Sequence, residues 1–113
     1  DVVADLGHHD FYSQPLRLLP RCARRLVGLP ALFVGVTAPI ETIIARRRAD
    51  AQAGFYAVDE TIVRRWQEAV HAPGIYDLVV DTAQMTPDEC AEAIVAVCAE
   101  PPERSAFERL TAG

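Results

Sequence analysis

The chain has 113 residues, with 16 acidic side chains against 11 basic ones, a formal net charge of −5 and 50% hydrophobic residues. This length suffices for one soluble domain with its own core, without metal ions or disulfide bonds. The net negative charge and the lack of a basic tail exclude nucleic acid and anionic membrane surfaces as main partners. The longest apolar run, residues 31–36, is far shorter than the ~20 residues of a membrane-spanning helix.

Arginine supplies every basic side chain, and the sequence contains no lysine. Because the phosphate-binding loop G-x-x-x-x-G-K-[ST] requires a lysine, no complete copy of it is present in this chain. The cysteines lie in helical patterns without metal-binding spacing, which favours small core side chains in a reducing, cytoplasmic compartment. They are Cys22, Cys90 and Cys98.

The first half of the chain predicts two strands and a helix. The apolar residues 2–4 indicate a short buried strand that ends at Asp5. An amphipathic pattern predicts a helix over residues 20–27, closed by Gly28 in the left-handed conformation. The apolar run 31–36 is typical of a central strand in a parallel sheet.

Two helices are expected next. Pro39 suits a first helical position, and the helix it begins is expected to end at the arginines 46–48, which complement the helix dipole. Asp59 and Glu60 open another helix, with Glu60 and Arg64 at a favourable spacing for an ion pair. Proline and glycine at 73–74 end it.

The last third predicts one more strand and one more helix. Residues 75–81 read as the third strand, and 86–89 (Thr-Pro-Asp-Glu) form a capping box at the start of a helix. The two prolines at 101–102 end the ordered part, so we divide the chain into a domain at 1–100 and a loose or weakly helical tail at 101–113.

Strands that alternate with helices predict an α/β fold with a parallel sheet. Ligands of such sheets bind beyond the carboxyl ends of the strands. The polar residues expected at that edge are Asp5, His8, His9, Thr37, Asp81 and Thr82. Adjacent histidines point in different directions, so His8 and His9 are not predicted to hold a metal ion.

Three segments resemble the chloramphenicol phosphotransferase-like family. Residues 70–82, which read V-H-A-P-G-I-Y-D-L-V-V-D-T, carry the most specific similarity. The strand L-F-V-G-V at 32–36, followed by P-I-E at 39–41 and then Arg46, is similar to a second segment in the same order. Residues 2–5 look like the third strand of that family, so the resemblance extends over roughly residues 1–99.

The resemblance implies a P-loop kinase-like fold with three layers and a parallel sheet, of which this chain carries the last three strands and their helices. It also implies ATP-dependent phosphorylation of a hydroxyl group on a small antibiotic such as chloramphenicol, with Mg²⁺ as cofactor, and hence antibiotic resistance. The phosphate loop and the general base of the family precede the segment that matches here. The chain alone is therefore expected to be inactive.

The resemblance further implies roles for several residues. Asp5 stands where a strand-end acid holds magnesium, and Arg46 matches the lid arginine that contacts nucleotide phosphates. Further lid arginines of the family are missing from residues 49–53, and Arg48 is the better substitute for them than Arg47. Simple roles compete with these: a solvated loop carboxylate for Asp5, and helix-end arginines that complement the dipole for Arg46 and Arg48.

Asp81 and Thr82 fall at the loop that such kinases place beside the adenine, although an ordinary strand-to-helix loop has the same pattern. Four aromatic residues in expected loops suit an aryl substrate pocket, with core or surface packing as the alternative reading. They are Phe11, Tyr12, Phe55 and Tyr56.

Two other functions stay open: a non-catalytic remnant or interaction domain, and a kinase for a different small hydroxylated molecule. The family's strand order separates the strand at 2–4 from the one at 31–36 by a strand that this sequence does not contain. Such a gap predicts marginal folding or self-association through an open sheet edge.

Overall fold

A parallel pair of strands forms the centre of the computed structural model, which describes residues 1–6, 16–52 and 59–112. Strand β1 (Val34–Thr37) pairs with β2 (Leu78–Asp81), and Val34 lies opposite Leu78 while Thr37 lies opposite Asp81. The prediction of an α/β fold with a parallel sheet is confirmed. The P-loop kinase-like strand order is implied by the resemblance alone.

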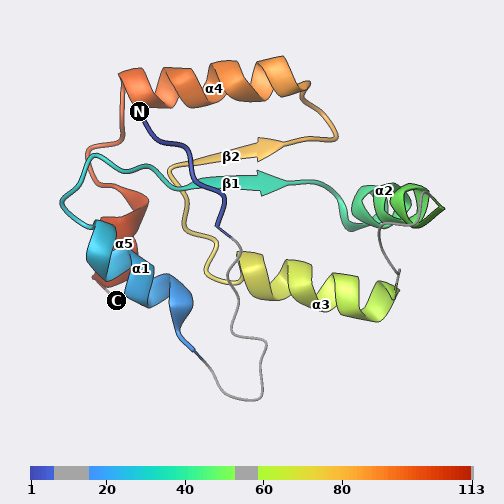
Figure 1. Cartoon of the computed structure of the whole chain (residues 1–113). Helices are drawn as coiled ribbons and strands as arrows, with labels where there is room; N and C mark the ends of the chain where they lie inside the picture. Colours follow the sequence, from blue (N-terminus) through green and yellow to red (C-terminus); the bar gives the residue numbers. More distant parts are fainter. Residues whose placement is uncertain (7–15, 53–58, 113) are drawn as a thin grey trace.

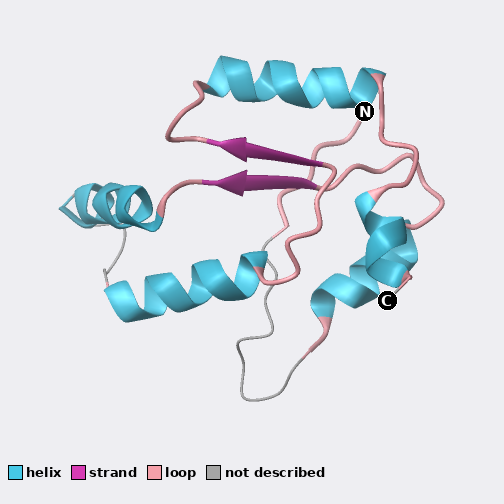
Figure 2. Cartoon of the chain, turned by 180° about the vertical axis from the view of Figure 1, so that it is seen from behind, coloured by secondary structure: helices cyan, strands magenta, loops and turns pink. Residues whose placement is uncertain are grey.

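Helices lie on both sides of this pair. In Figure 1, α4 runs along one side of the strands, α3 along the other, and α2 lies beyond the arrowheads that mark the carboxyl ends. Figure 2 shows the same arrangement from behind, with α1 and α5 beside each other near the amino ends of the strands. Within the described ranges, no helix is long and apolar enough to cross a membrane. The helices are α1 (Leu18–Leu26), α2 (Ile40–Gln52), α3 (Glu60–His71), α4 (Pro87–Ala99) and α5 (Ala106–Thr111).

Local capping sets the helix ends much as the sequence predicts. The carboxylate of Asp59 accepts hydrogen bonds from the N–H groups of Thr61 and Ile62, so α3 begins where expected. Thr86 and Glu89 form the reciprocal capping box of α4. After α1, Gly28 has a φ of 84°, the left-handed conformation predicted for it.

The strand expected at residues 2–4 is not formed. Residues 1–6 contain neither helix nor strand, and the side chains of Val2 and Val3 are 92% and 99% exposed. A strand needs a neighbour to complete its hydrogen bonds, and β1 and β2 pair only with each other in the described part of the chain. The prediction of a strand at residues 2–4 is therefore wrong. Of the three predicted strands, the described part of the chain forms two, β1 and β2.

Helix α2 is longer than predicted. Its residues run to Gln52, so the arginines 46–48 lie inside the helix and not in its last turn. No glycine or proline occurs between Ile40 and Gln52, and alanine is the strongest helix former. The arginines 46–48 therefore do not lie in the last turn of α2, where they would complement the helix dipole.

The main core lies near the amino ends of the strands and includes the carboxyl-terminal helix. The rings of Phe33 and Phe107 stack with centroids 5.2 Å apart, and Phe33 also packs on Tyr76 at 4.9 Å. Within the segment expected as a loose or weakly helical tail, residues 106–111 form α5 and pack into this core. The division at residue 100 stays a prediction. The buried members of this core are Leu19, Ala23, Phe33, Ala106 and Phe107.

Gly35 is required where it stands because the Tyr76 ring lies against the backbone of β1. A Cβ atom at Gly35 would lie 2.9 Å from the Tyr76 ring, closer than real Cβ contacts allow. The ring can therefore cover the strand only where β1 carries no side chain.

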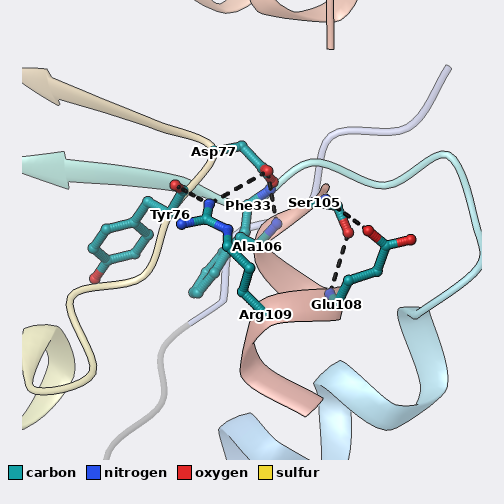
Figure 3. A network of polar contacts seen from close by, with 7 residues as sticks. All are labelled: Phe33, Tyr76, Asp77, Ser105, Ala106, Glu108 and Arg109. Carbon is teal, nitrogen blue, oxygen red and sulfur yellow. Dashed lines mark hydrogen bonds and ion pairs between the residues drawn. The ribbon is translucent and has the colours of Figure 1, made fainter. Parts of the chain in front are cut away.

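The carboxylate of Asp77 joins both strands to α5 (Figure 3). This side chain is fully buried, and it accepts hydrogen bonds from the N–H groups of Phe33 and Ala106, each at 2.7 Å. The guanidinium of Arg109 lies 4.0 Å from it and donates a hydrogen bond to the Tyr76 carbonyl at 2.8 Å. Ala106 is the first residue of α5, so the carboxylate also meets the positive end of that helix.

Asp77→Asn is predicted to destabilise the fold. The amide places an N–H group where a backbone N–H now donates, which leaves a buried donor unsatisfied at a cost of about 1–3 kcal/mol. The free energy of unfolding, measured with urea, should fall by that amount. Asp50→Asn, at an exposed acid on α2, is the control, and equal losses in both variants would contradict the role of Asp77.

The outer edge of β1 has open backbone groups. Phe33 and Thr37 direct their carbonyl groups toward β2, where Asp77 and Thr82 donate to them. Because backbone groups alternate along a strand, the N–H and C=O groups of Val34 and Val36 point away from β2. No other strand lies there in the part of the chain that the structure describes, and the Val36 side chain is 59% exposed.

We expect the chain to self-associate through this edge, because unpaired strand edges add further strands. Val36→Lys should weaken the association by bringing together like charges, without unfolding the monomer, since Val36 is already exposed. Sedimentation velocity over a range of concentrations measures the effect. Val95→Lys, at a 67% exposed valine on α4, is the matched control. A wild-type chain that stays monomeric throughout would refute the expectation.

Candidate functional site: the carboxyl ends of the two strands

Arg46 reaches from α2 to the loop that follows β2. Its Nη1 donates a hydrogen bond to the Thr82 hydroxyl at 2.8 Å, and its Nη2 donates to the Thr82 carbonyl at 3.0 Å. The two residues are 36 positions apart in the sequence. Helix α2 begins just beyond the end of β1, which brings its second turn to the carboxyl edge of the sheet (Figure 1).

Thr82 is itself held by β1. Its N–H donates to the Thr37 carbonyl at 2.8 Å, and its hydroxyl donates to the same oxygen at 3.2 Å. The hydroxyl of Thr37 donates to the Val80 carbonyl at 3.2 Å. Thr37 and Thr82 therefore meet at one edge, as the rule for parallel sheets predicts. Arg46, which the family resemblance suggested, joins them there.

Asp81 shapes the loop next to this cluster. Its carboxylate accepts a hydrogen bond from the Ala83 N–H at 2.8 Å. Its carbonyl accepts from the N–H groups of Gln84 and Met85. These contacts make a tight turn between β2 and α4, and the adenine-side role of Asp81 and Thr82 stays a prediction.

A mostly apolar hollow of ≈ 580 Å³ opens beside the cluster. Strands β1 and β2 contribute Val36 and Val80, and α4 contributes side chains such as Cys90 and Ile94. Arg46 and Thr82 also line it. The hollow thus combines an apolar surface with a guanidinium. The apolar surface suits the ring of a ligand, and the guanidinium suits an anionic group.

Arg48, the second predicted lid residue, lies away from this cluster. It forms an ion pair with Glu60 of α3, and Arg64 of α3 pairs with Glu41 of α2 at 2.8 Å. The ion pair expected between Glu60 and Arg64 is therefore replaced by pairs between the two helices. The guanidinium of Arg47 lies 5.8 Å from the Trp66 ring centre, which adds a cation–π contact to the same interface.

Of the remaining predicted residues, only Asp5 is described, and it is not joined to the cluster. Asp5 lies in the exposed segment without a strand, so the strand-end position that suggested its magnesium role is absent, and the role itself stays a prediction. The histidines at 8 and 9 and the four predicted substrate-pocket aromatics lie outside the described residues. The latter are Phe11, Tyr12, Phe55 and Tyr56.

A magnesium site is not formed by the residues that the structure describes. No group of three His, Cys, Asp or Glu side chains in these ranges is placed to hold a metal ion. Divalent magnesium takes oxygen ligands from carboxylates and phosphates. Asp5 by itself does not complete a magnesium site in these ranges, and its role toward the ion stays a prediction.

His71 belongs to the opposite end of the sheet. It is the last residue of α3, and its Nδ1 lies 2.5 Å from the hydroxyl of Tyr76. Partial burial lowers the pKa of His71 below 6.5 and raises the pKa of Tyr76 above 10.0. Both side chains are packed next to the core.

The structure is that of an α/β protein in which Arg46 is held at the carboxyl edge of a parallel pair of strands. Ligands of parallel sheets bind at that edge, and a guanidinium there suits phosphate. A family model described as chloramphenicol phosphotransferase-like protein matches residues 1–99, and the chain belongs to this family. The family is one of kinase-like phosphotransferases. No curated protein and no solved structure matches the chain.

The lowered pKa of His71 predicts a pH-dependent stability. Between the folded pKa and 6.5, the unfolded chain binds more protons at His71 than the folded chain does, so the free energy of unfolding rises with pH there. This contribution is complete above pH 6.5 and is lost as the pH falls through the folded pKa. Urea unfolding at several pH values should show the slope in the wild type and a smaller slope in His71→Gln. Identical slopes would contradict the prediction.

Proposed function

We propose that the chain is the later part of an ATP-dependent phosphotransferase that phosphorylates a hydroxyl group of a small antibiotic such as chloramphenicol. The observation that supports this most is the Arg46–Thr82 contact at the carboxyl edge of the sheet, in a member of a phosphotransferase family. An arginine at that edge suits the nucleotide phosphates in the proposed reaction.

In this reaction the hydroxyl oxygen of the acceptor bonds to the γ-phosphorus of ATP while the bond from phosphorus to the ADP oxygen breaks. The hydroxyl proton passes to a base, and negative charge is spread over the transferred group and the leaving oxygen. The guanidinium of Arg46 has more N–H donors than its contacts with Thr82 use, so it retains donors for phosphate oxygens. Its charge would oppose the negative charge of the phosphates.

The other assignments are parts of the same proposal. Asp81 and Thr82 form the adenine-side loop, next to the apolar hollow in which a base ring would lie. Arg48 would act as a second phosphate ligand after leaving Glu60. Asp5 would hold Mg²⁺, and the substrate pocket would use Phe11, Tyr12, Phe55 and Tyr56.

An interaction domain or non-catalytic remnant is the second candidate. The lid arginines missing from residues 49–53 and the ion pair that occupies Arg48 favour it. A kinase for another small hydroxylated molecule is a third candidate, because loops at the substrate side change specificity without changing the fold.

The test is a phosphorylation assay of the protein produced from the complete open reading frame that contains this sequence. With Mg²⁺-ATP and chloramphenicol, mass spectrometry should detect the acceptor with one added phosphoryl group. Arg46→Ala should lower kcat/KM by about 10–100-fold, if one charged contact to the transferred phosphate is worth about 1.5–3 kcal/mol. The chain of 113 residues alone should give no product.

Each result separates the candidates. Transfer to other hydroxylated compounds but not to chloramphenicol would support the third candidate. A folded full-length protein that neither binds ATP nor modifies any acceptor would support the second and refute the proposal. Product from the isolated chain would refute the expectation that essential parts lie outside it.

A further inference from the structure

Thr82 connects three elements that are distant in the sequence. Its side chain lies between Arg46 of α2 and the Thr37 carbonyl at the end of β1. No other polar side chain in the described ranges is hydrogen-bonded to Arg46 by the contacts that the structure records. Thr82 thus holds the guanidinium of Arg46 at the carboxyl edge.

The direction of these hydrogen bonds is fixed by chemistry. A guanidinium has only donors, so the Thr82 hydroxyl must accept from Arg46. A carbonyl has only acceptors, so the single hydroxyl proton must be donated to Thr37. Both requirements are met at once, with Arg46 Nη1 at 2.8 Å and the Thr37 oxygen at 3.2 Å from the hydroxyl. A valine at this position satisfies neither.

We infer that Thr82 is a positioning residue that sets the place of Arg46 for a nucleotide phosphate, and that its side chain does not contact the adenine. The inference rests on the proposed function and adds a role to one residue of the same site. Arg46 is exposed, and a long exposed side chain loses rotamer entropy when it binds. The contact with Thr82 orders the guanidinium before the ligand arrives.

The side-chain role can be separated from the backbone role of Thr82. Its N–H bond to the Thr37 carbonyl, at 2.8 Å, does not involve the hydroxyl, and its carbonyl still accepts from Arg46 in any variant. Thr82→Val therefore removes the hydroxyl while keeping the branched shape and the link between the strands. Thr82→Ser keeps the hydroxyl and provides the rescue.

The experiment measures ATP affinity by titration calorimetry, with the protein from the complete open reading frame. Thr82→Val should weaken binding about 5–10-fold, within the usual cost of ordering one long side chain on binding, and Thr82→Ser should stay near the wild type. In the Arg46→Ala background, Thr82→Val should have no further effect, because the residue it positions is gone. Thr61→Val, at an exposed threonine of α3, is the matched control.

Two results would overturn the inference. One is a Thr82→Val variant that binds ATP as tightly as the wild type. The other is an equal loss of affinity with and without Arg46, which would mean that Thr82 contacts the nucleotide directly.

A ligand-free measurement separates this inference from the proposed function. The Nη1–H NMR signal of Arg46, which comes from the group that donates to the Thr82 hydroxyl, should exchange slowly with water in the wild type and Thr82→Ser, and quickly in Thr82→Val. If the wild type binds no ATP but this pattern holds, the proposed function fails while the positioning by Thr82 stands. Fast exchange in the wild type would overturn the positioning itself.

Discussion

The buried carboxylate of Asp77 is the interaction on which the rest of the structure depends. A buried charge is costly unless donors surround it, and Asp77 obtains them from the backbone of Phe33 and of Ala106. These donors belong to the residue before β1 and to the first turn of α5, so one side chain fixes the strand register and docks the last helix. A pair of strands has little stability by itself, which makes this link essential.

The register set at one end of the pair determines the geometry at the other. With Val34 opposite Leu78, the end of β1 meets the end of β2, and the Thr37 carbonyl falls within reach of Thr82. Thr82 then holds Arg46, which ties α2 to the sheet. The ion pairs between α2 and α3 are exposed and contribute little to stability. Arg46 gives α2 a contact with the end of the sheet, which those pairs do not provide.

Local signals predicted much of this fold, and tertiary contacts account for the rest. The capping box at Thr86 and the apolar runs identified α4 and both strands, and the rule of carboxyl ends placed Thr37 near Thr82. Arg46 was suggested by the family resemblance alone. The partner of Arg48 depends on how α2 meets α3, which no local pattern encodes. Two further local signals are present in the sequence: Asp77 is an acid inside an apolar run, and residues 105–108 form a second capping box, the one that opens α5.

The open sheet edge and the candidate site are not independent, because Val36 belongs to both. Its side chain lines the hollow beside Arg46, while its backbone groups face outward from β1. Neighbouring strands lie about 4.8 Å apart, so any strand that pairs with Val36 must also lie next to the hollow. A segment that completes the sheet therefore changes the surface that a ligand of Arg46 meets. By linkage, a ligand that prefers the completed sheet strengthens that pairing by the same factor.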